Sequence, residues 1–204
     1  MRKLYILTFA MTFFAATTVL GQISGSAHDF SNENWNNSGE ICIVCHTPHN
    51  ADVTVTDAPL WNHEVTTATF TLYSSATLDA AVGQPDGSSK LCLSCHDGTV
   101  AVDNFGGRTN GNEFVSGDEL IGTDLSDDHP VSFVYDATLA STDGGLYDPT
   151  TTNSGLGGTI DDDLLIGNKV QCASCHDVHN GSGVADLLRK SNAQSAFCLT
   201  CHNK

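Results

Sequence analysis

Residues 171–202, QCASCHDVHNGSGVADLLRKSNAQSAFCLTCH, are the stretch that decides how this chain folds. They contain two Cys-x-x-Cys-His motifs, Cys172–His176 and Cys198–His202. The motif occurs twice more, at Cys42–His46 and Cys92–His96, so all 8 cysteines of the 204-residue chain stand in pairs that are followed directly by histidine. The sequence therefore predicts four equivalent attachment points, with no cysteine left over.

The motif Cys-x-x-Cys-His is typical of covalent haem attachment. Its two thiols form thioether bonds to the haem vinyl groups, and the adjoining histidine becomes the proximal ligand of the iron. We therefore expect four haem c groups as cofactors. The attachment residues are Cys42, Cys45, Cys92, Cys95, Cys172, Cys175, Cys198 and Cys201. The proximal iron ligands are His46, His96, His176 and His202.

Paired cysteines have other uses that must be weighed. Zinc ribbons place two Cys-x-x-Cys units about 15–20 residues apart and do not need a histidine after each. Cysteines of an exported chain can instead form disulfides. Thioredoxin-like redox pairs need a βαβ context, which is absent here. The histidine after every pair favours haem over all three.

The second axial ligand of each iron follows from the methionines and histidines that remain. The only methionines are Met1 and Met11, both in the N-terminal leader, so the mature chain has no methionine to offer. Histidines outside the motifs stand at His28, His49, His63, His129 and His179. These five candidates can serve four irons, so we expect bis-histidine ligation throughout, which implies low reduction potentials.

Two of these histidines follow a motif closely. His49 comes three residues after His46. His179 comes three residues after His176. A residue so near in sequence stays on the proximal side of the haem and cannot reach its opposite face. We therefore expect each to ligate a different haem, in the same chain or in another, and so to bring haems into close-packed pairs.

The N-terminal residues are expected to direct export. Residues 4–20 carry no charge and follow Met1-Arg2-Lys3, a pattern typical of a secretory signal peptide. We predict a signal peptide over 1–21, with cleavage as late as residue 27 also open, and a tetrahaem domain over 22–204. An uncleaved membrane anchor is the alternative, because a stretch of this length only just reaches the lower limit for a spanning helix.

The chain is strongly acidic, with 24 Asp and Glu against 8 Lys and Arg and a formal net charge of −16. Such a surface repels nucleic acid and anionic lipid, so we expect neither nucleic acid nor stable membrane insertion after signal cleavage. It would steer cationic partners, such as redox partner proteins, or simply keep the protein soluble, and the second reading is favoured for most of these carboxylates. The acidic runs Asp124–Asp128 and Asp161–Asp163 lack the spacing of an EF-hand and are expected to be solvated loops.

Regular secondary structure is expected to be sparse. Alternation predicts short strands at Ala68–Tyr73 and Val131–Tyr135, and short helices are expected at Ser75–Val82 and Val184–Ser191. Residues 103–168 are rich in Gly, Asp, Thr and Ser, and little of this segment shows helical or strand periodicity. The expected fold class is mostly irregular coil with short helices and a few short strands, a multihaem cytochrome c wrapped around a stacked haem chain.

Several blocks of the sequence resemble one known group. One is the doubled module His176–His202, with Asp186-Leu-Leu-Arg between its motifs. The others are His28-Asp-Phe-Ser, Cys45-His46-Thr-Pro-His49-Asn-Ala, Pro59-Leu-Trp-Asn-His63, Leu91-Cys-Leu-Ser-Cys-His-Asp-Gly-Thr and Asp128-His129-Pro-Val-Ser-Phe. Together they resemble the tetrahaem outer-surface c-type cytochromes that polymerise into extracellular filaments, the cytochrome nanowires. The resemblance spans residues 28–202, except for 137–168.

The resemblance implies a continuous row of haems with bis-histidine ligation. It also implies that one distal histidine is donated by a neighbouring chain, a role that falls on His49. It favours His28, His129 and His179 as the other distal ligands and leaves His63 as the spare candidate.

Three functions compete. The first is electron transfer as a subunit of a conductive filament, exported to the extracellular space or cell surface. The second is electron transfer by a monomeric periplasmic multihaem carrier. The third is a multihaem enzyme of the nitrite or hydroxylamine type, which needs an open iron position. Five spare histidines for four irons make an open position unnecessary, so we expect no catalytic residues and no enzymatic activity.

Overall fold

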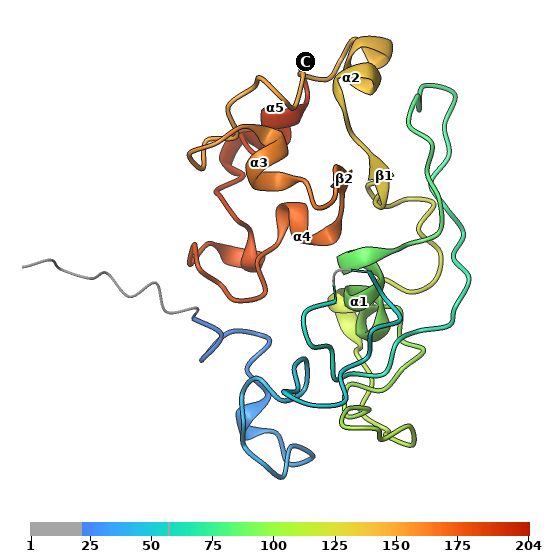
Figure 1. The fold of residues 1–204 in the computed structure, drawn as a ribbon, viewed down its shortest axis with the longest axis vertical. Coiled ribbons are helices and arrows are strands. Elements are labelled where there is room, and N and C mark those ends of the chain that lie inside the picture. The colour runs from blue at the N-terminus through green and yellow to red at the C-terminus, as the bar shows by residue number, and fades with distance from the viewer. Residues whose placement is uncertain (1–21, 57) are drawn as a thin grey trace, which may run out of the picture.

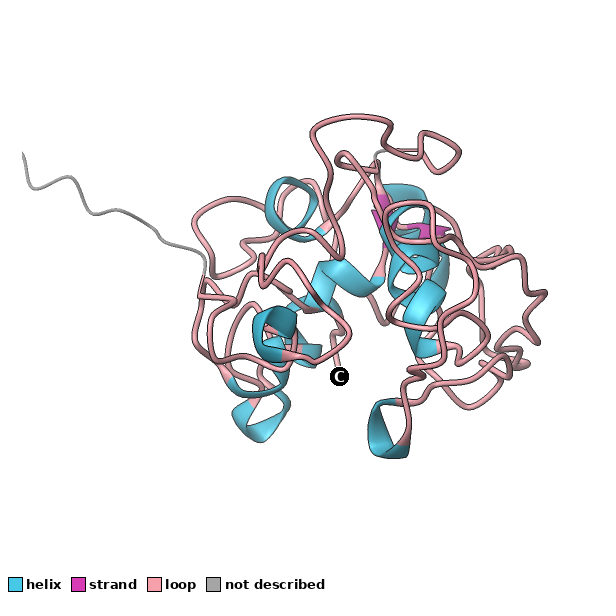
Figure 2. Ribbon diagram, turned by 90° about the horizontal axis from the view of Figure 1, so that it is seen from below, coloured by secondary structure: helices cyan, strands magenta, loops and turns pink. Residues whose placement is uncertain are grey.

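The computed structural model describes residues 22–56 and 58–204, most of which form irregular chain (Figures 1 and 2). The helices are α1 (Gly87–His96), α2 (Ala137–Asp143), α3 (Ile160–Leu164), α4 (Cys172–Cys175) and α5 (Cys198–Cys201). Short 3-10 turns are η1 (Phe30–Asn32), η2 (Gly117–Glu119), η3 (Ala185–Leu187) and η4 (Ala193–Ser195). The strands are β1 (Phe133–Val134) and β2 (Lys169–Val170). The prediction of irregular coil with short helices and a few short strands is confirmed.

The predicted signal peptide, 1–21, lies outside the described residues. Along the part of the chain that the structure covers, no helix has both the length and the apolar character needed to cross a membrane.

The helix α1 carries the second Cys-x-x-Cys-His motif. Its buried Leu93 packs with Phe70 and Leu125 in a small apolar cluster. The N–H of Asp97 donates to the carbonyl of Leu93 at 2.9 Å, which closes the last turn. Gly98 follows at φ +71°, a left-handed conformation that glycine adopts without strain. The motif is therefore held on a helix whose inner face and end are both fixed.

A second apolar cluster lies among the C-terminal elements (Figure 1). Its buried members are Phe133, Tyr135, Ala140, Ile160, Leu164 and Phe197. The antiparallel pair β1–β2, with Phe133 opposite Val170, joins this cluster to the segment that enters α4. The third and fourth motifs therefore stand around one core.

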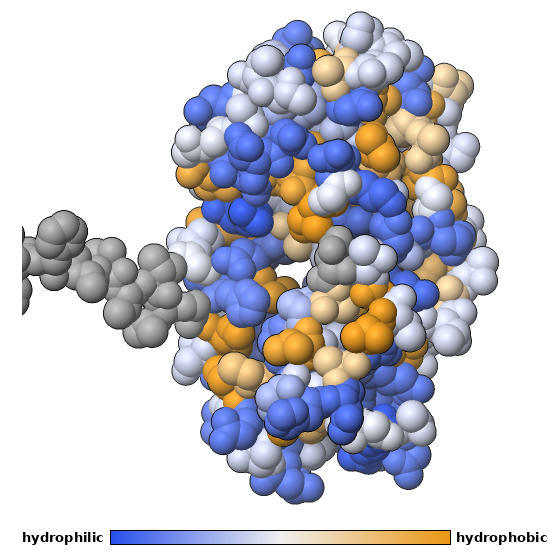
Figure 3. All heavy atoms as spheres, in the orientation of Figure 1, coloured by the Kyte–Doolittle hydropathy of each residue, from blue (hydrophilic) through white to orange (hydrophobic). Residues whose placement is uncertain are grey.

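The two clusters leave the middle of the molecule open. The space-filling view shows a hollow between its upper and lower halves (Figure 3). Large apolar side chains stay exposed, including Leu60, Phe114 and Ile121. A single chain of this size ordinarily buries most of its apolar surface around one core. The polypeptide alone therefore leaves apolar surface of the kind that a bulky cofactor could cover.

Two of the four predicted elements are found in part. β1 lies within the strand predicted at Val131–Tyr135, and η3 lies within the helix predicted at Val184–Ser191. The strand predicted at Ala68–Tyr73 is wrong: only Thr71 forms an isolated bridge. The side-chain amide of Gln84 bonds both the N–H and the carbonyl of Phe70, at 2.8 and 2.9 Å, and takes the place of a partner strand.

The helix predicted at Ser75–Val82 is also wrong, because this segment is irregular and packs Ala80 and Val82 against the C-terminal cluster. The weak periodicity of 103–168 also concealed structure, since α2 and α3 fall within it and neither was predicted. Local caps explain both helices. Asp136 accepts the N–H of Leu139 at 2.8 Å, and Thr159 forms a capping box at the start of α3.

Candidate functional site

Each Cys-x-x-Cys-His motif forms one helical turn. The N–H of the motif histidine donates to the carbonyl of the first cysteine, at 2.8 Å in His46, 3.0 Å in His176 and 3.0 Å in His202. The second motif is the last part of α1. Residues three apart in a helical turn lie on one face. The two thiols of each motif therefore share a face, as joint attachment to one planar cofactor requires.

The alternatives to haem find little support in the geometry. All eight cysteines are free thiols. In residues 22–56 and 58–204, no group of three His, Cys, Asp or Glu side chains converges as a metal site. A structural zinc ion needs four such ligands. In this part of the chain the cysteine pairs therefore form neither a disulfide framework nor a zinc ribbon.

The buried thiols also differ from those of redox-active pairs. Burial, together with the nearby Cys42 thiol, raises the pKa of Cys45 to about 11. Burial also raises the pKa of Cys95 to about 12. Thiols of disulfide oxidoreductases have lowered pKa values instead. Cys172 is the exception: its hydrogen bond with Cys92 lowers its pKa to about 7 and raises that of Cys92.

The motifs follow one another through space in the order of the sequence. Thiols of consecutive motifs lie close enough to affect pKa values: Cys45 raises the pKa of Cys95, Cys92 and Cys172 shift each other's, and Cys175 raises that of Cys201. The second and third motifs are in direct contact, since α1 packs against α4 (Figure 1). Cofactors attached at these positions would form a row from the first motif to the fourth.

Three of the four motif histidines are oriented by a main-chain carbonyl. The pairs of Nδ1 and carbonyl oxygen are His46 and Pro59 at 2.6 Å, His96 and Glu119 at 2.7 Å, and His176 and Asp186 at 2.9 Å. A carbonyl can only accept, so Nδ1 carries the proton. The lone pair of Nε2 is then left free for a metal, as in metal-ligating histidines whose other nitrogen is held by the protein.

Three motif histidines also face a histidine from outside the motifs. The ring centroids are 6.0 Å apart in His28–His96, 6.2 Å in His46–His179 and 6.3 Å in His129–His202. A metal–imidazole bond of about 2.0 Å and a ring radius of about 1.1 Å place two imidazoles on opposite sides of one metal about 6.2 Å apart. The three pairs therefore fit bis-histidine ligation of one iron each.

His28 has the surroundings of a metal ligand. Its ring is largely buried, and its Nδ1 is buried with no hydrogen-bond partner among the described residues. Burial, followed by the nearby His96 and His176, lowers the pKa of His28 to about 4. The ring is therefore neutral at physiological pH, which is the form that binds a metal.

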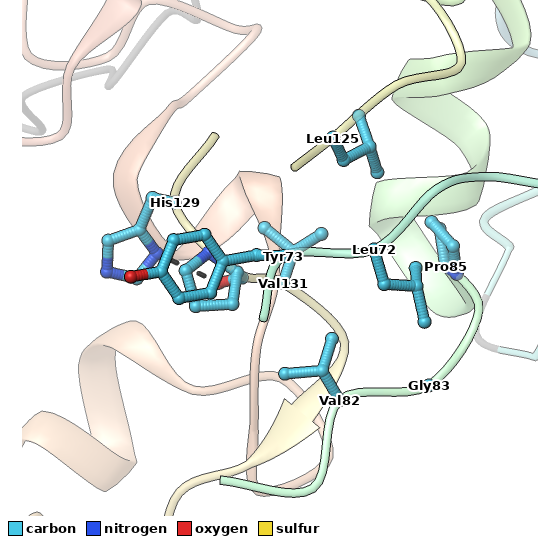
Figure 4. A pocket seen from close by; sticks show the side chains of 9 residues that line it. Leu72, Tyr73, Val82, Gly83, Pro85, Leu125, His129 and Val131 are labelled. Carbon is cyan, nitrogen blue, oxygen red and sulfur yellow. Dashed lines mark hydrogen bonds between the residues drawn. The ribbon is translucent and has the colours of Figure 1, made fainter. Parts of the chain in front are cut away.

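His129 stands at the edge of a small pocket (Figure 4). Its Nδ1 donates to the carbonyl of Pro130 at 2.8 Å, which leaves Nε2 available as in the motif histidines. The pocket is lined mainly by apolar residues, among them Leu72, Val82 and Leu125. An apolar wall beside a free ring nitrogen suits the edge of a haem.

His63, the predicted spare, is placed differently. It is 2% exposed, and both ring nitrogens face main-chain carbonyls: Nδ1 that of Glu64 at 2.8 Å and Nε2 that of Ala101 at 3.0 Å. The aromatic ring beside it is that of Trp61. Burial lowers the pKa of His63, and a neutral ring donates to only one of the two carbonyls. Both nitrogens nevertheless point at main-chain oxygens, so the ring would have to turn to reach an iron.

One motif histidine and one predicted distal ligand remain unmatched. Among ring pairs of the described residues, neither His176 nor His49 has an imidazole partner near 6 Å. Both side chains are exposed. His49 lies near two exposed apolar side chains, because the carbonyl of exposed Leu60 accepts the N–H of Thr47 and the neighbouring Val53 is 86% exposed. The chain therefore contains three complete imidazole pairs and two half-pairs.

Sequence reasoning could not find the carbonyls that orient the motif histidines. Those of Pro59, Glu119 and Asp186 are main-chain groups, and any residue type could supply them. Asp186 lies in a tight turn with φ +57°, which is visible only in the backbone.

Comparisons with known proteins bear on the C-terminal end. A family model described as the doubled CXXCH motif matches residues 166–204. No curated protein sequence matches the chain. The matched segment contains β2, α4 and α5, and therefore the third and fourth Cys-x-x-Cys-His motifs. It overlaps the doubled module that the sequence resemblance identified at His176–His202. Residues 166–204 are thus similar to the doubled CXXCH module of c-type cytochromes, and the CXXCH motifs indicate a haem-binding electron-transfer protein.

Proposed function

We propose that this protein is an exported electron-transfer cytochrome that carries four covalently bound haem c groups with bis-histidine ligation and assembles into an extracellular conductive filament. The observation that carries the proposal is the set of three imidazole pairs with centroids 6.0 to 6.3 Å apart. Each pair joins a motif histidine to a histidine elsewhere in the chain, as a shared iron would require.

The roles of the residues follow from their positions. Bound haem would supply an iron that gains and releases one electron. The cysteine pairs hold each group on one helical turn, and the carbonyls of Pro59, Glu119 and Asp186 keep three proximal imidazoles in the metal-binding tautomer. A pair of histidines on every iron keeps both axial positions filled, which suits electron transfer rather than substrate binding.

The two half-pairs support assembly. His176 has no distal imidazole in its own chain among the described residues, whereas His49 has no motif histidine. His49 of one chain can complete the site of His176 in the next. Such a head-to-tail contact uses two different surfaces and can repeat without closing, which generates a filament. The exposed Val53 and Leu60 beside His49 would add apolar area to this contact.

The first experiment counts the haems. The full chain, expressed in a host with a cytochrome c maturation system, should give an intact mass with four haems added to the cleaved polypeptide and a low-spin absorption spectrum. Carbon monoxide should leave the spectrum of the reduced protein unchanged. A mass with no haem would remove the proposal, and binding of carbon monoxide would favour a multihaem enzyme.

The second experiment separates filament from monomer. We expect negative-stain microscopy of the secreted wild-type protein to show fibres about one subunit thick. His49→Ala should abolish them and yield monomers. His179→Ala is the matched control, because it also removes one distal ligand but one that serves its own chain, so fibres should persist. A wild-type protein that stays monomeric would leave the periplasmic carrier as the better assignment.

A further inference from the structure

A polar network with a buried centre and a partly exposed edge joins the segments that carry the second and third motifs. The Nε2 of Gln171 donates to Oδ1 of Asp86 at 2.9 Å. The Oε1 of Gln171 accepts the hydroxyl of Ser132 at 3.0 Å and the N–H of Ser89 at 3.3 Å. Lys169 pairs with the other carboxylate oxygen of Asp86. We call Asp86, Ser89, Ser132, Lys169 and Gln171 the Gln171 network.

The centre of the network is almost closed to solvent. Gln171 is 3% exposed and Ser89 is 0% exposed. The chain also makes room for the Gln171 amide at Gly87, where a Cβ would stand only 3.1 Å from Nε2 and where φ is +47°. Any other residue at this position would be both strained and crowded. A buried network whose members are all bonded fixes one arrangement, because leaving any of them unpaired is costly.

The network touches both motifs at their first cysteine. The N–H of Cys172 donates to the hydroxyl of Ser89, at 2.9 Å, and Ser89 stands one helical turn before Cys92 on α1. Gln171 itself directly precedes Cys172. The thiols of Cys92 and Cys172 are hydrogen-bonded to each other. The same few side chains therefore set the position of α1 relative to α4 at the point where the two motifs meet.

We propose that Gln171 is a positioning residue for electron transfer, which fixes the geometry between the cofactors of the second and third motifs through its bonds to Asp86, Ser89 and Ser132. This inference rests on the proposed function, since it needs haem at both motifs. The rate of electron transfer between two centres depends steeply on their separation and orientation. A side chain that locks two attachment helices together therefore acts on the transfer step without touching either iron.

The test exchanges donor and acceptor across one hydrogen bond. Gln171→Glu places a carboxylate against that of Asp86 and removes the Nε2 donor. Adding Asp86→Asn to this variant restores a donor on the opposite side, so the bond can form again with its direction reversed. Gln171→Leu cannot be rescued in this way. The exposed Gln194, four residues before Cys198, supplies the control Gln194→Leu.

The readout is circular dichroism in the Soret band, whose bisignate couplet reports the relative orientation of neighbouring haems. Haem content, measured separately by the pyridine haemochrome assay, should stay at four per chain. We expect Gln171→Glu and Gln171→Leu to lower the couplet amplitude by about two-fold or more. Both variants remove the side-chain amide that joins the segments of the second and third motifs. The Asp86→Asn, Gln171→Glu double variant should recover most of it, and Gln194→Leu should match wild type.

Each outcome of this test either supports or contradicts the positioning role of Gln171. A wild-type couplet in Gln171→Leu with four haems would overturn the positioning role, and so would failure of the double variant to improve on Gln171→Glu. If Gln171→Glu does not take up four haems at all, recovery of haem content in the double variant supports the role and its absence contradicts it. Wild-type protein without haem would instead refute the proposed function, and the haemochrome assay separates that case from the others.

Discussion

His46 and His179 lie with ring centroids 6.2 Å apart and ring planes within 12° of parallel, although one belongs to the first motif and the other follows the third. The pair joins the N-terminal segment to the C-terminal module. His179 lies against His46 rather than its neighbour His176. That a histidine three residues after a motif ligates the iron of a different motif stays a prediction.

Replacing His179 by methionine should raise the reduction potential of one haem. The iron at His46 would then have one histidine and one methionine ligand, and methionine ligation raises the potential relative to bis-histidine. A spectroelectrochemical titration should show one component at a higher potential with the others unchanged.

Val178→Met is the matched control for this substitution. Val178 is 38% exposed and adjoins His179 in sequence. A methionine there should leave all potentials in place. An identical titration for His179→Met and wild type would show that His179 does not ligate an iron.

Replacing His63 by leucine should change stability but not ligation. His63 faces the carbonyls of Glu64 and Ala101 in a buried site and donates to one of them, so loss of its ring leaves that acceptor unpaired. We expect a loss of roughly 2 kcal/mol in the free energy of unfolding. Chemical denaturation followed by far-ultraviolet circular dichroism measures it.

The absorption spectrum checks the prediction that His63→Leu leaves haem ligation unchanged. With His63→Leu, all haems should stay low-spin and six-coordinate. A high-spin band in this variant, at wild-type haem content, would mean that His63 is an axial ligand after all.

Attachment chemistry was the part of this protein most open to prediction from sequence, because Cys-x-x-Cys-His is a local pattern and each motif folds as one local turn. The imidazole pairs were harder. His28 lies beside His96, and His129 beside His202, because of the path taken by long irregular segments, and such segments have no periodicity from which that path could be predicted. The count of histidines indicated that such pairs could form, and the resemblance favoured His28, His129 and His179 as distal ligands. Neither assigned a distal histidine to a particular motif.

The helices α2 and α3 were missed because their signals are single caps rather than patterns. Asp136 before α2, Gly144 after it and the Thr159 capping box are each visible in sequence, but composition rich in Gly and Asp outweighed them. The segment Ser75–Val82 was mistaken for a helix, but it is irregular and packs Ala80 and Val82 against the C-terminal cluster. Tertiary contacts decided that case.

Asp86 should contribute to stability against acid. Burial alone would raise the pKa of its carboxyl, but hydrogen bonds from Lys169 and Gln171 outweigh burial and hold it below its usual 3.8. A lowered pKa in the folded state gives stability that is present above pH 3.8 and is lost as the pH falls through the folded value. The carboxylate is partly exposed and screened, so the contribution is at most about 1 kcal/mol.

The measurement for Asp86 is the free energy of unfolding of wild type and Asp86→Asn between pH 6 and pH 2. The difference between them should be largest near pH 6 and should shrink below about pH 4. A difference that stays constant across the range would mean that the charge of Asp86 has no part in it.

The capping box of α3 should be worth about 1 kcal/mol. Thr159 accepts the N–H of Asp162 at 3.2 Å, and the carboxylate of Asp162 accepts the N–H of Thr159 at 3.1 Å. Thr159→Ala should therefore lower the midpoint of thermal unfolding. Thr151→Ala, at an exposed position of the preceding turn, should leave it unchanged. Equal midpoints for both variants would count against the cap.

The most direct test of the central claim is quantitative electron paramagnetic resonance of the oxidised His49→Ala monomer, normalised to its haem content. The imidazole pairs predict three low-spin haems, for the sites of His46, His96 and His202, and one high-spin haem for the site of His176. Four low-spin haems in this monomer would contradict the account, because His176 would then have a distal ligand within its own chain.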